Sequence, residues 1–421
     1  MAKLPLEGIR IVDITVVWVG PFTTQMLADW GAEVIRVEPL QVFQPETRAP
    51  NPRALKTGKG GGYGGYPDYD PGKRPWNRNT LFQIHGRNKL SMTADLQSAD
   101  CMEAFLRLVN VSDVMIENNV PDTMDKLGVS YELLKKVRPD IIMVRVPAYG
   151  LSGPYARYRA FGSHMEAVAG HTAIRGYRDL PTPSRGITYF CDAVGGMAAA
   201  YATVAALCHR RRTGQGQLVE VATAEATIPY IGEAVMDYTM SQRLQGPLGN
   251  RHPSMAPQGC YPCKGEDSWL VISVGSDQEW ESLREAMGDP EWARDGCFST
   301  VLGRFNNQDV LDQHIADWTR EHDHIELMHH LQKRGIAAAA VHDQKELFND
   351  PHMQHRSFFE ELYQPETGTH RYCGMQWKMD QTPNSIRLPS PMLGEHNEWA
   401  YKELLGITDQ EYRKLEDAGH I

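Results

Sequence analysis

One carboxylate in this sequence stands where chain direction, burial and helix geometry change together. Asp192 lies in the stretch ITYFCDAVGGM, residues 187–197, after an apolar run and before two glycines and an alanine-rich helix. Because an aspartate is ionised at neutral pH, it needs no general base to act as a nucleophile. A carboxylate is a weak nucleophile, so its partner must be an activated acyl group such as a thioester, held close and in line.

The glycines after Asp192 bear on the same chemistry. Gly195 and Gly196 are expected in the first turn of the helix, and in a helix each costs roughly 0.5–1 kcal/mol relative to alanine. The pair indicates that a backbone or a ligand comes very close. Attack on a thioester places negative charge on the carbonyl oxygen, which backbone N–H groups at a helix start can receive. The alternative is structural: Asp192 caps the helix, and the glycines let helices pack.

The elements that must position Asp192 are predicted to form an α/β fold. Residues 9–15 predict a buried strand. A helical pattern that ends near Gly31 follows it, and a second strand is predicted at 33–38. Such a strand–helix–strand unit implies a parallel sheet. Residues 40–85 are predicted to be irregular, after which helices and strands alternate, and residues 219–243 predict a strand and one long helix.

A change of composition near residue 245 predicts a second, smaller domain. Residues 259–275 predict a hairpin, and short helices follow to about residue 350 with a strand between them. One of these helices, in HDHIELMHH (322–330), is expected to turn Ile325 and Met328 inward. The tail from about residue 370 has no core of its own, so it is expected to return to the first domain.

Composition argues against nucleic acid and membranes. The net charge is −10, from 43 basic and 53 acidic residues, whereas binding to phosphate backbones requires a basic surface. The sequence has no apolar run of about 18 residues, and its start does not look like a signal peptide. We therefore expect a cytoplasmic protein that does not enter a membrane.

Several familiar motifs are missing. The turn after the first strand has one glycine, Gly20, and lacks the G-x-G-x-x-G of dinucleotide-binding proteins. The Gly/Tyr-rich insertion 57–76 lacks the phosphate-loop pattern and is interpreted as a surface insertion or lid. Cys260 and Cys263 form a single C-x-x-C and are interpreted as reduced thiols, and the histidines of 322–330 as a solvated helix face. No metal site is predicted.

Six motifs in chain order resemble the class III CoA-transferase family of the CaiB–BaiF type. They are GIRIVDIT…GP…GAEVIRVEP at the start, HGRNKLSMTADL (85–96), DVMIENNVPDTMDKLGVSYE (113–132), RRRTGQGQLVEV (210–221), GNRHPSMAPQGCYP (249–262) and PMLGEHNEW (391–399). The resemblance implies a Rossmann-like large domain formed by both chain ends plus a smaller α+β domain, in an interlocked dimer. The implied boundaries are 1–225 and 351–421 for the large domain with its return linker and tail, 226–250 for a linker helix and 251–350 for the small domain.

The resemblance also implies a mechanism with Asp192 as the catalytic residue. Asp192 would attack a donor acyl-CoA, such as succinyl-CoA, and form an aspartyl–acyl anhydride and CoA thiolate. The thiolate would return to form an aspartyl-CoA thioester and free the donor acid. An acceptor carboxylic acid would then repeat the exchange and leave as the new thioester. CoA enters as a substrate, so no tightly bound cofactor is expected.

Binding residues follow from the same resemblance. The implied CoA-binding residues are Trp18, Val19, Lys89, Asn118 and Lys126, which together would supply local positive charge on an acidic protein. The residues implied at the substrate, or argued above to lie there, are Phe161, Glu166, Gly195 and Gly196. The chain departs from the family pattern at Pro39, where some members carry an arginine, at Asn119, where phenylalanine is usual, and at Glu166, where glutamine is common.

Two other functions stay open. A racemase of the same superfamily would need a histidine base at position 161, where this chain has Phe161, and His164 is three residues out of register. A CoA-binding subunit of a heteromeric transferase is expected to lack Asp192, although a chain with the aspartate could still pair with a paralogous subunit instead of a second copy.

The acceptor acid is also open. Bulky residues near the expected site, namely Trp18, Phe161, Met165, Tyr189 and Phe190, hint at an aromatic or large apolar acid such as benzylsuccinate. The alternative is that these residues belong to the core. Carnitine-type and short dicarboxylic acids are further possibilities.

Overall fold

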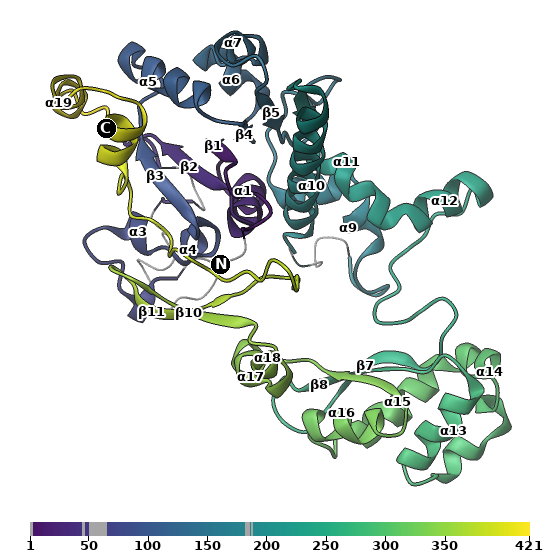
Figure 1. Cartoon of the computed structure of the whole chain (residues 1–421). Coiled ribbons are helices and arrows are strands. Elements are labelled where there is room, and N and C mark those ends of the chain that lie inside the picture. The colour runs from purple at the N-terminus through teal and green to yellow at the C-terminus, as the bar shows by residue number, and fades with distance from the viewer. Residues whose placement is uncertain (1–2, 44–46, 50–64, 182–185, 187) are drawn as a thin grey trace. The chain divides into compact units, whose positions relative to one another are not determined.

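The computed structural model describes residues 3–43, 47–49, 65–181, 186 and 188–421. The chain divides into two compact units (Figure 1). The larger unit comprises Met1–His171, Ile187–Glu233 and Gln354–Ile421, and the smaller unit comprises Thr172–Gly186 and Ala234–Met353.

A sheet of six parallel strands forms the centre of the larger unit. Its strands are β1 (Arg10–Asp13), β2 (Glu33–Glu38), β3 (Lys89–Thr93), β4 (Val114–Glu117), β5 (Ile142–Arg145) and β6 (Leu218–Glu220), in the order β3-β2-β1-β4-β5-β6. The α/β class and the parallel sheet predicted from the sequence are confirmed. Sheets with this strand order bind ligands at the carboxyl ends of the strands, where the order reverses.

Helices surround this sheet. In chain order the larger unit contains α1 (Val19–Asp29), α3 (Pro75–Arg78), α4 (Thr80–Gly86), α5 (Ala99–Asn110), α6 (Pro121–Leu127), α7 (Tyr131–Val137), α8 (Gly162–Val168), α10 (Phe190–Thr213), α11 (Thr223–Thr227) and α19 (Asp409–Asp417). Helices α9 (His171–Ile174), α12 (Gly232–Ser241) and α18 (Pro351–His355) run from one unit into the other. A short 3₁₀ turn, Pro67–Tyr69, and a π-helical turn, Trp399–Leu404, also belong to the larger unit.

Two hydrophobic cores lie on the two faces of the sheet, because successive side chains of a strand point to opposite faces. On one face, Val12 and Ile35 pack with α5, α6, α7 and α19. On the other face, Ile11, Val34 and Val144 pack with α1 and α10. Helix α10, which carries Asp192, therefore packs on this face of the sheet through an apolar core.

Two expectations about the helices were wrong. Residues 40–85 are not irregular throughout, since α3 and most of α4 lie there. The stretch after β6 is not one long helix, because a 3₁₀ turn, Ile228–Ile231, separates α11 from α12. Pro229 lies in that turn, and a proline cannot donate the backbone hydrogen bond that an uninterrupted α-helix requires.

The end of the chain covers the β3 edge of the sheet. Asn397 Oδ1 accepts a hydrogen bond from the N–H of Thr93 at 2.8 Å, and the Tyr401 hydroxyl donates to the carbonyl oxygen of Thr93 at 2.8 Å. A hairpin of β10 (Phe359–Gln364) and β11 (Gly368–Cys373) precedes this segment. Covering an edge strand removes a template for pairing with other chains.

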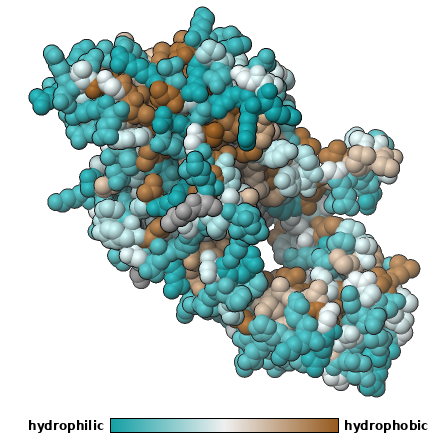
Figure 2. All heavy atoms as spheres, viewed as in Figure 1, coloured by the Kyte–Doolittle hydropathy of each residue, from teal (hydrophilic) through white to brown (hydrophobic). Residues whose placement is uncertain are grey.

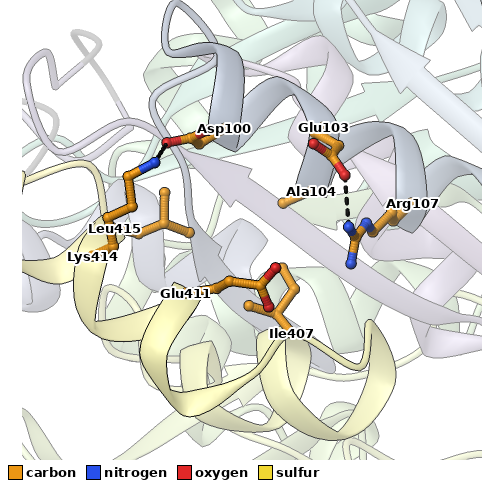
Figure 3. Close-up of a pocket in the computed structure, with 8 residues that line it drawn as sticks. All are labelled: Asp100, Glu103, Ala104, Arg107, Ile407, Glu411, Lys414 and Leu415. Atoms are coloured by element: carbon orange, nitrogen blue, oxygen red, sulfur yellow. Dashed lines mark hydrogen bonds and ion pairs between the residues drawn. The ribbon is translucent and has the colours of Figure 1, made fainter.

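Helix α19 lies against α5 across a small pocket of about 140 Å³ (Figure 3). Lys414 of α19 pairs with Asp100 of α5 at 2.7 Å, while Glu103 and Arg107 pair within α5. These charged groups surround Ala104, Ile407 and Leu415. Because Lys414 and Arg107 are paired with carboxylates, we interpret this pocket as the contact that holds α19 against α5.

The smaller unit is built on an antiparallel sheet of β7 (Gln258–Pro262), β8 (Trp269–Ser273) and β9 (Ala337–Ala340). The predicted hairpin at 259–275 is confirmed as β7 and β8. Its helices are α13 (Asp277–Ala286), α14 (Val301–Asn306), α15 (Gln308–Thr319), α16 (His324–Gln332) and α17 (Gln344–Asn349), with 3₁₀ turns at Glu291–Arg294 and Gly296–Phe298. Helix α16 buries Leu327 and Leu331, whereas Ile325 and Met328, which were expected to face inward, are only partly buried.

Two chemical features of the described residues complete this outline. All seven cysteines are free, including Cys260 and Cys263. One helix, α10, is long and apolar enough to cross a membrane, and 56% of its most apolar window is buried in the fold. Buried core helices of soluble proteins pass the same test, so the length of α10 is weak evidence for a membrane span.

Candidate active site

Asp192 lies in the first turn of α10 and not before the helix. The helix begins at Phe190, so Asp192 is its third residue, and Gly195 and Gly196 fall in the second turn. The side chain of Asp192 is buried, with 5% of the residue exposed. A crossover helix runs antiparallel to the strands it connects, so this first turn lies at the carboxyl edge of the sheet.

The carboxylate of Asp192 lies against the first residue of α8. A Cβ atom built on Gly162 would stand 2.0 Å from Asp192 Oδ2, far inside van der Waals contact. Glycine is therefore the residue that leaves space for the carboxylate at this point. No feature of the local sequence marks Gly162, because the contact joins residues 30 positions apart.

Phe161 precedes this glycine and is 52% exposed, so its ring is available to a ligand. Its backbone N–H donates to Nδ1 of His164 at 3.2 Å. The histidine beside the racemase position is thus engaged in a hydrogen bond within its own helix turn.

Glu166 is buried and accepts hydrogen bonds from the start of α10. Its Oε1 accepts from the N–H of Phe190 at 3.0 Å, from the Thr188 hydroxyl at 2.9 Å and from the N–H of Cys191 at 3.5 Å. Its Oε2 lies 3.4 Å from Nδ1 of His171. Both carboxylate oxygens of Glu166, which was expected at the substrate, thus contact groups of the protein.

The two glycines of α10 allow close packing. A Cβ on Gly195 would stand 2.6 Å from Thr223 Cγ2 and 3.2 Å from Val19 Cγ2. A Cβ on Gly196 would stand 2.7 Å from Cδ1 of Phe22. Both glycines thus let α10 approach α1 and α11, which places the first turn of α1 beside the second turn of α10.

Aromatic rings join the same two helix starts. Trp18 stacks on Tyr189 with ring centroids 6.0 Å apart and planes inclined by 5°. The rings of His85 and Trp18 meet edge to face, with their centroids 4.6 Å apart. Burial, together with the nearby charges of Lys89 and Arg36, lowers the pKa of His85 to about 3, so this imidazole is neutral at physiological pH.

The loop between β1 and α1 is held in an unusual conformation. Val17 has a φ of 63°, a value that is strained for a β-branched residue. Its N–H donates to Thr47 Oγ1 at 2.8 Å. Asn118 accepts from the N–H of Val16 at 2.8 Å and donates to its carbonyl oxygen at 2.9 Å. Asn118 therefore clamps the loop that leads into Trp18 and Val19.

A pocket of about 340 Å³ opens beside this loop, at the carboxyl ends of β1, β2 and β4. Its walls include Thr15 and Val16 after β1, Glu38 and Pro39 at the end of β2, and Asn119 after β4. Residues of α6 also line it, and Lys126 lies exposed in the last turn of that helix. Open α/β sheets bind their ligands at such a place.

Three of the residues that line this pocket, Arg36, Glu38 and Arg48, are buried and charged. Burial raises the pKa of Glu38, but the guanidinium groups of Arg48 and Arg36, at 2.8 and 2.9 Å, outweigh burial and lower it to about 2. Arg48 also donates to the carbonyl oxygen of Pro391, which links the pocket to the end of the chain.

Lys89 differs from the other expected CoA-binding residues because it is fully buried. Its ammonium lies 3.2 Å from Asp13 Oδ2 and donates to Thr24 Oγ1 at 2.7 Å and to the carbonyl oxygen of Pro21 at 2.9 Å. Burial lowers the pKa of Lys89 to about 8 against the attraction of Asp13. The structure thus brings Trp18, Val19 and Asn118 together, whereas Lys89 supports the start of α1 from within. Among the described residues no cluster of three or more potential metal ligands is found.

Comparisons with known proteins agree on one family. The model of CoA-transferase family III matches residues 6–397. The chain is 32% identical over 413 residues to a succinyl-CoA–D-citramalate CoA-transferase of Chloroflexus aurantiacus, covering 98% of this chain and 97% of that protein. It is 29% identical to the beta subunit of a succinyl-CoA–L-malate CoA-transferase of the same organism, covering 98% and 97%.

A solved structure agrees as well. The crystal structure of a CAIB/BAIF family protein from Brucella suis matches with a TM-score of 0.83 and 27% identity, covering 96% of this chain and 100% of that one. The resemblance seen in the sequence motifs is confirmed. The chain belongs to CoA-transferase family III and is an enzyme of that class.

Proposed function

We propose that this enzyme transfers CoA from succinyl-CoA to a carboxylic acid, with Asp192 as the nucleophile. The observation that carries the proposal is the position of Asp192: a buried carboxylate at a helix start, facing the one residue type that leaves space for it. Both relatives named above use succinyl-CoA, as their names state.

The reaction would proceed in four exchanges at one carboxylate. An Asp192 oxygen attacks the thioester carbonyl, the C–S bond breaks, and an aspartyl–succinyl anhydride and CoA thiolate form. The thiolate attacks the aspartyl carbonyl and releases succinate, leaving an aspartyl-CoA thioester. The acceptor carboxylate attacks this thioester, giving a new anhydride and CoA thiolate. The thiolate then attacks the acceptor carbonyl, which frees Asp192 and the new acyl-CoA. No net proton is gained or lost.

CoA would occupy the pocket at the carboxyl edge of the sheet. Trp18 and Val19 stand between this pocket and α10, and Asn118 fixes the loop that precedes them. Lys126 would face the phosphates from the exposed end of α6. We assign Lys89 an indirect part, since its ammonium holds Asp13 and the first turn of α1.

For the acceptor we propose a short dicarboxylic acid. Both relatives carry the name of such an acid, citramalate or malate. Three of the four aromatic residues that suggested a large apolar acid contact other rings of the protein: Trp18 stacks on Tyr189, and the Phe190 centroid lies 4.9 Å from that of His171 and 5.5 Å from that of Tyr230. The fourth, Phe161, is 52% exposed. Rings engaged in this way support packing, and a panel of acids that includes malate, citramalate and benzylsuccinate separates the two interpretations.

We also propose the interlocked dimer, with a second copy of this chain as partner and with the large and small domains divided as the family resemblance implies. Met197, Tyr201 and Val204 form a stripe on α10 at helical spacing, and they are 45%, 79% and 38% exposed. Figure 2 shows hydrophobic residues among the mostly hydrophilic ones on the face in view. Because one relative is named a beta subunit, a paralogous partner is the alternative.

The test of the proposed chemistry is mass spectrometry of the intact protein and its peptides after brief incubation with succinyl-CoA. We expect a succinyl or CoA adduct on the peptide that contains Asp192, and no adduct in Asp192→Ala. If neither form carries an adduct and the enzyme instead exchanges the α-hydrogen of an acyl-CoA for deuterium, the racemase interpretation is correct.

A further inference from the structure

Two carboxylates share the start of α10, and only one of them is assigned to the chemistry. We propose that Glu166 is a positioning residue that holds the first turn of α10 and, through its negative charge, makes Asp192 a stronger nucleophile. This inference rests on the proposed function, because it concerns the reactivity of Asp192 toward an acyl-CoA.

The hydrogen bonds of Glu166 show which group caps the backbone amides at the start of α10. The first amides of a helix have no partner within the helix, and an acidic side chain near them often turns back to accept their hydrogen bonds. Here Glu166, from α8, accepts from the amides of Phe190 and Cys191. Glu166 thus caps these amides from another helix, and Asp192 Oδ2 lies beside Gly162.

The charge of Glu166 acts in addition to its hydrogen bonds. A helix start carries a partial positive charge, which stabilises a nearby carboxylate and makes it less basic. A second carboxylate at the same helix start offsets this charge and disfavours the ionised form of its neighbour. Glu166 is 1% exposed, so water screens its field only weakly. The result is a more basic and more nucleophilic Asp192.

Among the residues that the structure describes, three titratable groups close to this pair are His171, Cys191 and Tyr149. His171 Nδ1 lies 3.4 Å from Glu166 Oε2. The Cys191 thiol lies 2.8 Å from Thr227 Oγ1, and burial raises its pKa to about 11, so it stays neutral. Burial also raises the pKa of the Tyr149 phenol.

The experiment measures the rate constant for loading of Asp192 by succinyl-CoA in a single turnover, as a function of pH. Glu166→Gln keeps an oxygen that can accept from the amides but removes the charge. Glu166→Asp keeps the charge but withdraws it from the amides by one methylene group. His171→Asn removes the imidazole beside Glu166 Oε2 and leaves Glu166 intact, and the melting temperature of each variant reports on the fold.

We expect Glu166→Gln to load Asp192 roughly threefold more slowly or worse, and the acidic limb of its pH profile to move to lower pH, because Asp192 becomes less basic. Glu166→Asp should keep an acidic limb close to that of the wild type even if its melting temperature falls. His171→Asn leaves both carboxylates in place, so it should keep an acidic limb close to that of the wild type.

The opposite pattern would overturn the inference. If Glu166→Gln loads with the wild-type rate and profile while Glu166→Asp loses activity with its stability, Glu166 is only a helix cap. If Glu166→Gln does not fold, Glu166→Asp decides. A shift of the acidic limb of its pH profile would then contradict the proposed effect of the Glu166 charge on Asp192. A wild-type enzyme that never loads Asp192 refutes the proposed function itself, which is a separate result.

Discussion

At the scale of single residues, the site depends on what stands opposite Asp192. A carboxylate must reach the thioester carbonyl along one line, and an error of about 1 Å can slow such a reaction a hundredfold. Gly162 lies where a methyl group would overlap Asp192 Oδ2. The overlapped atom ends a short side chain that can rotate away, so a substitution here should disturb the chemistry more than the fold.

We therefore predict that Gly162→Ala lowers the rate of acyl transfer at least tenfold while the melting temperature changes little. The physical reason is that the new methyl group displaces the nucleophile from its line of attack. Steady-state turnover and the Asp192 adduct report on the reaction, and thermal unfolding reports on the fold. Gly232→Ala is the matched control, because a Cβ on Gly232 meets no atom within 4 Å. An unchanged rate in Gly162→Ala would show that Asp192 keeps its place without this glycine.

The same residue scale shows how far the sequence could lead. Asp192 stood out because an ionisable side chain interrupts an apolar run before two glycines. Glu166 could be suspected but was assigned to the substrate, and Gly162 was not suspected at all. Their contacts join α8 to α10 across 24 to 30 positions of chain. Such a contact depends on how two helices meet, which a single sequence does not specify.

At the scale of elements, the position of α10, and with it that of Asp192, depends on its close approach to α1. The pair Gly195 and Gly196 suggested a close approach by a backbone or a ligand, and the structure shows side chains of α1 and α11 at the positions their Cβ atoms would take. The strands of the parallel sheet and several of the helices between them, such as α1, α5, α7 and α10, followed from the spacing of apolar residues along the chain. The break between α11 and α12 was missed because the helical pattern continues through Pro229.

We predict that Gly196→Ala lowers the free energy of unfolding by about 1–3 kcal/mol, the usual effect of overfilling a packed contact. The added methyl group would meet Phe22 Cδ1 at 2.7 Å and the carbonyl oxygen of Val19 at 3.2 Å. Urea unfolding measures the change. Gly232→Ala is the matched control: its Cβ would meet no atom within 4 Å, so the midpoint should shift far less. If both variants unfold at the wild-type midpoint, the glycine is not needed for packing.

At the scale of the whole molecule, an acidic protein keeps several cationic groups inside. Arg36, Arg48 and Lys89 are buried, and each of them pairs with Asp13, Glu38 or both. This network links β1, β2 and β3 with the loop after β2 and, through Arg48, with the carbonyl oxygen of Pro391 near the end of the chain. The sequence predicted that positive charge would be local, but it could not show that so much of it lies beneath the surface.

The stability of the larger unit should therefore depend on pH through Glu38. Its pKa is about 2 in the folded protein and near 4.5 when it is free. A carboxylate whose pKa is lowered by folding stabilises the protein above its unfolded pKa, and this contribution is lost as the pH falls from 4.5 to 2. The size of the shift corresponds to roughly 3 kcal/mol.

Arg48→Met tests this dependence, because it removes the guanidinium that makes the larger contribution to the lowered pKa of Glu38. We expect the variant to be less stable than the wild type at pH 7 by about 1–2 kcal/mol, a part of the whole effect, because Arg36 stays paired with Glu38. The two should converge as the pH falls, since protonated Glu38 no longer gains from Arg48. Urea unfolding at a series of pH values measures both curves. Arg107→Met is the control: its partner Glu103 is exposed, so its curve should run parallel to the wild type within about 0.5 kcal/mol. Parallel curves for Arg48→Met would instead mean that Glu38 titrates normally in the folded protein, and that acid unfolding begins elsewhere in the chain.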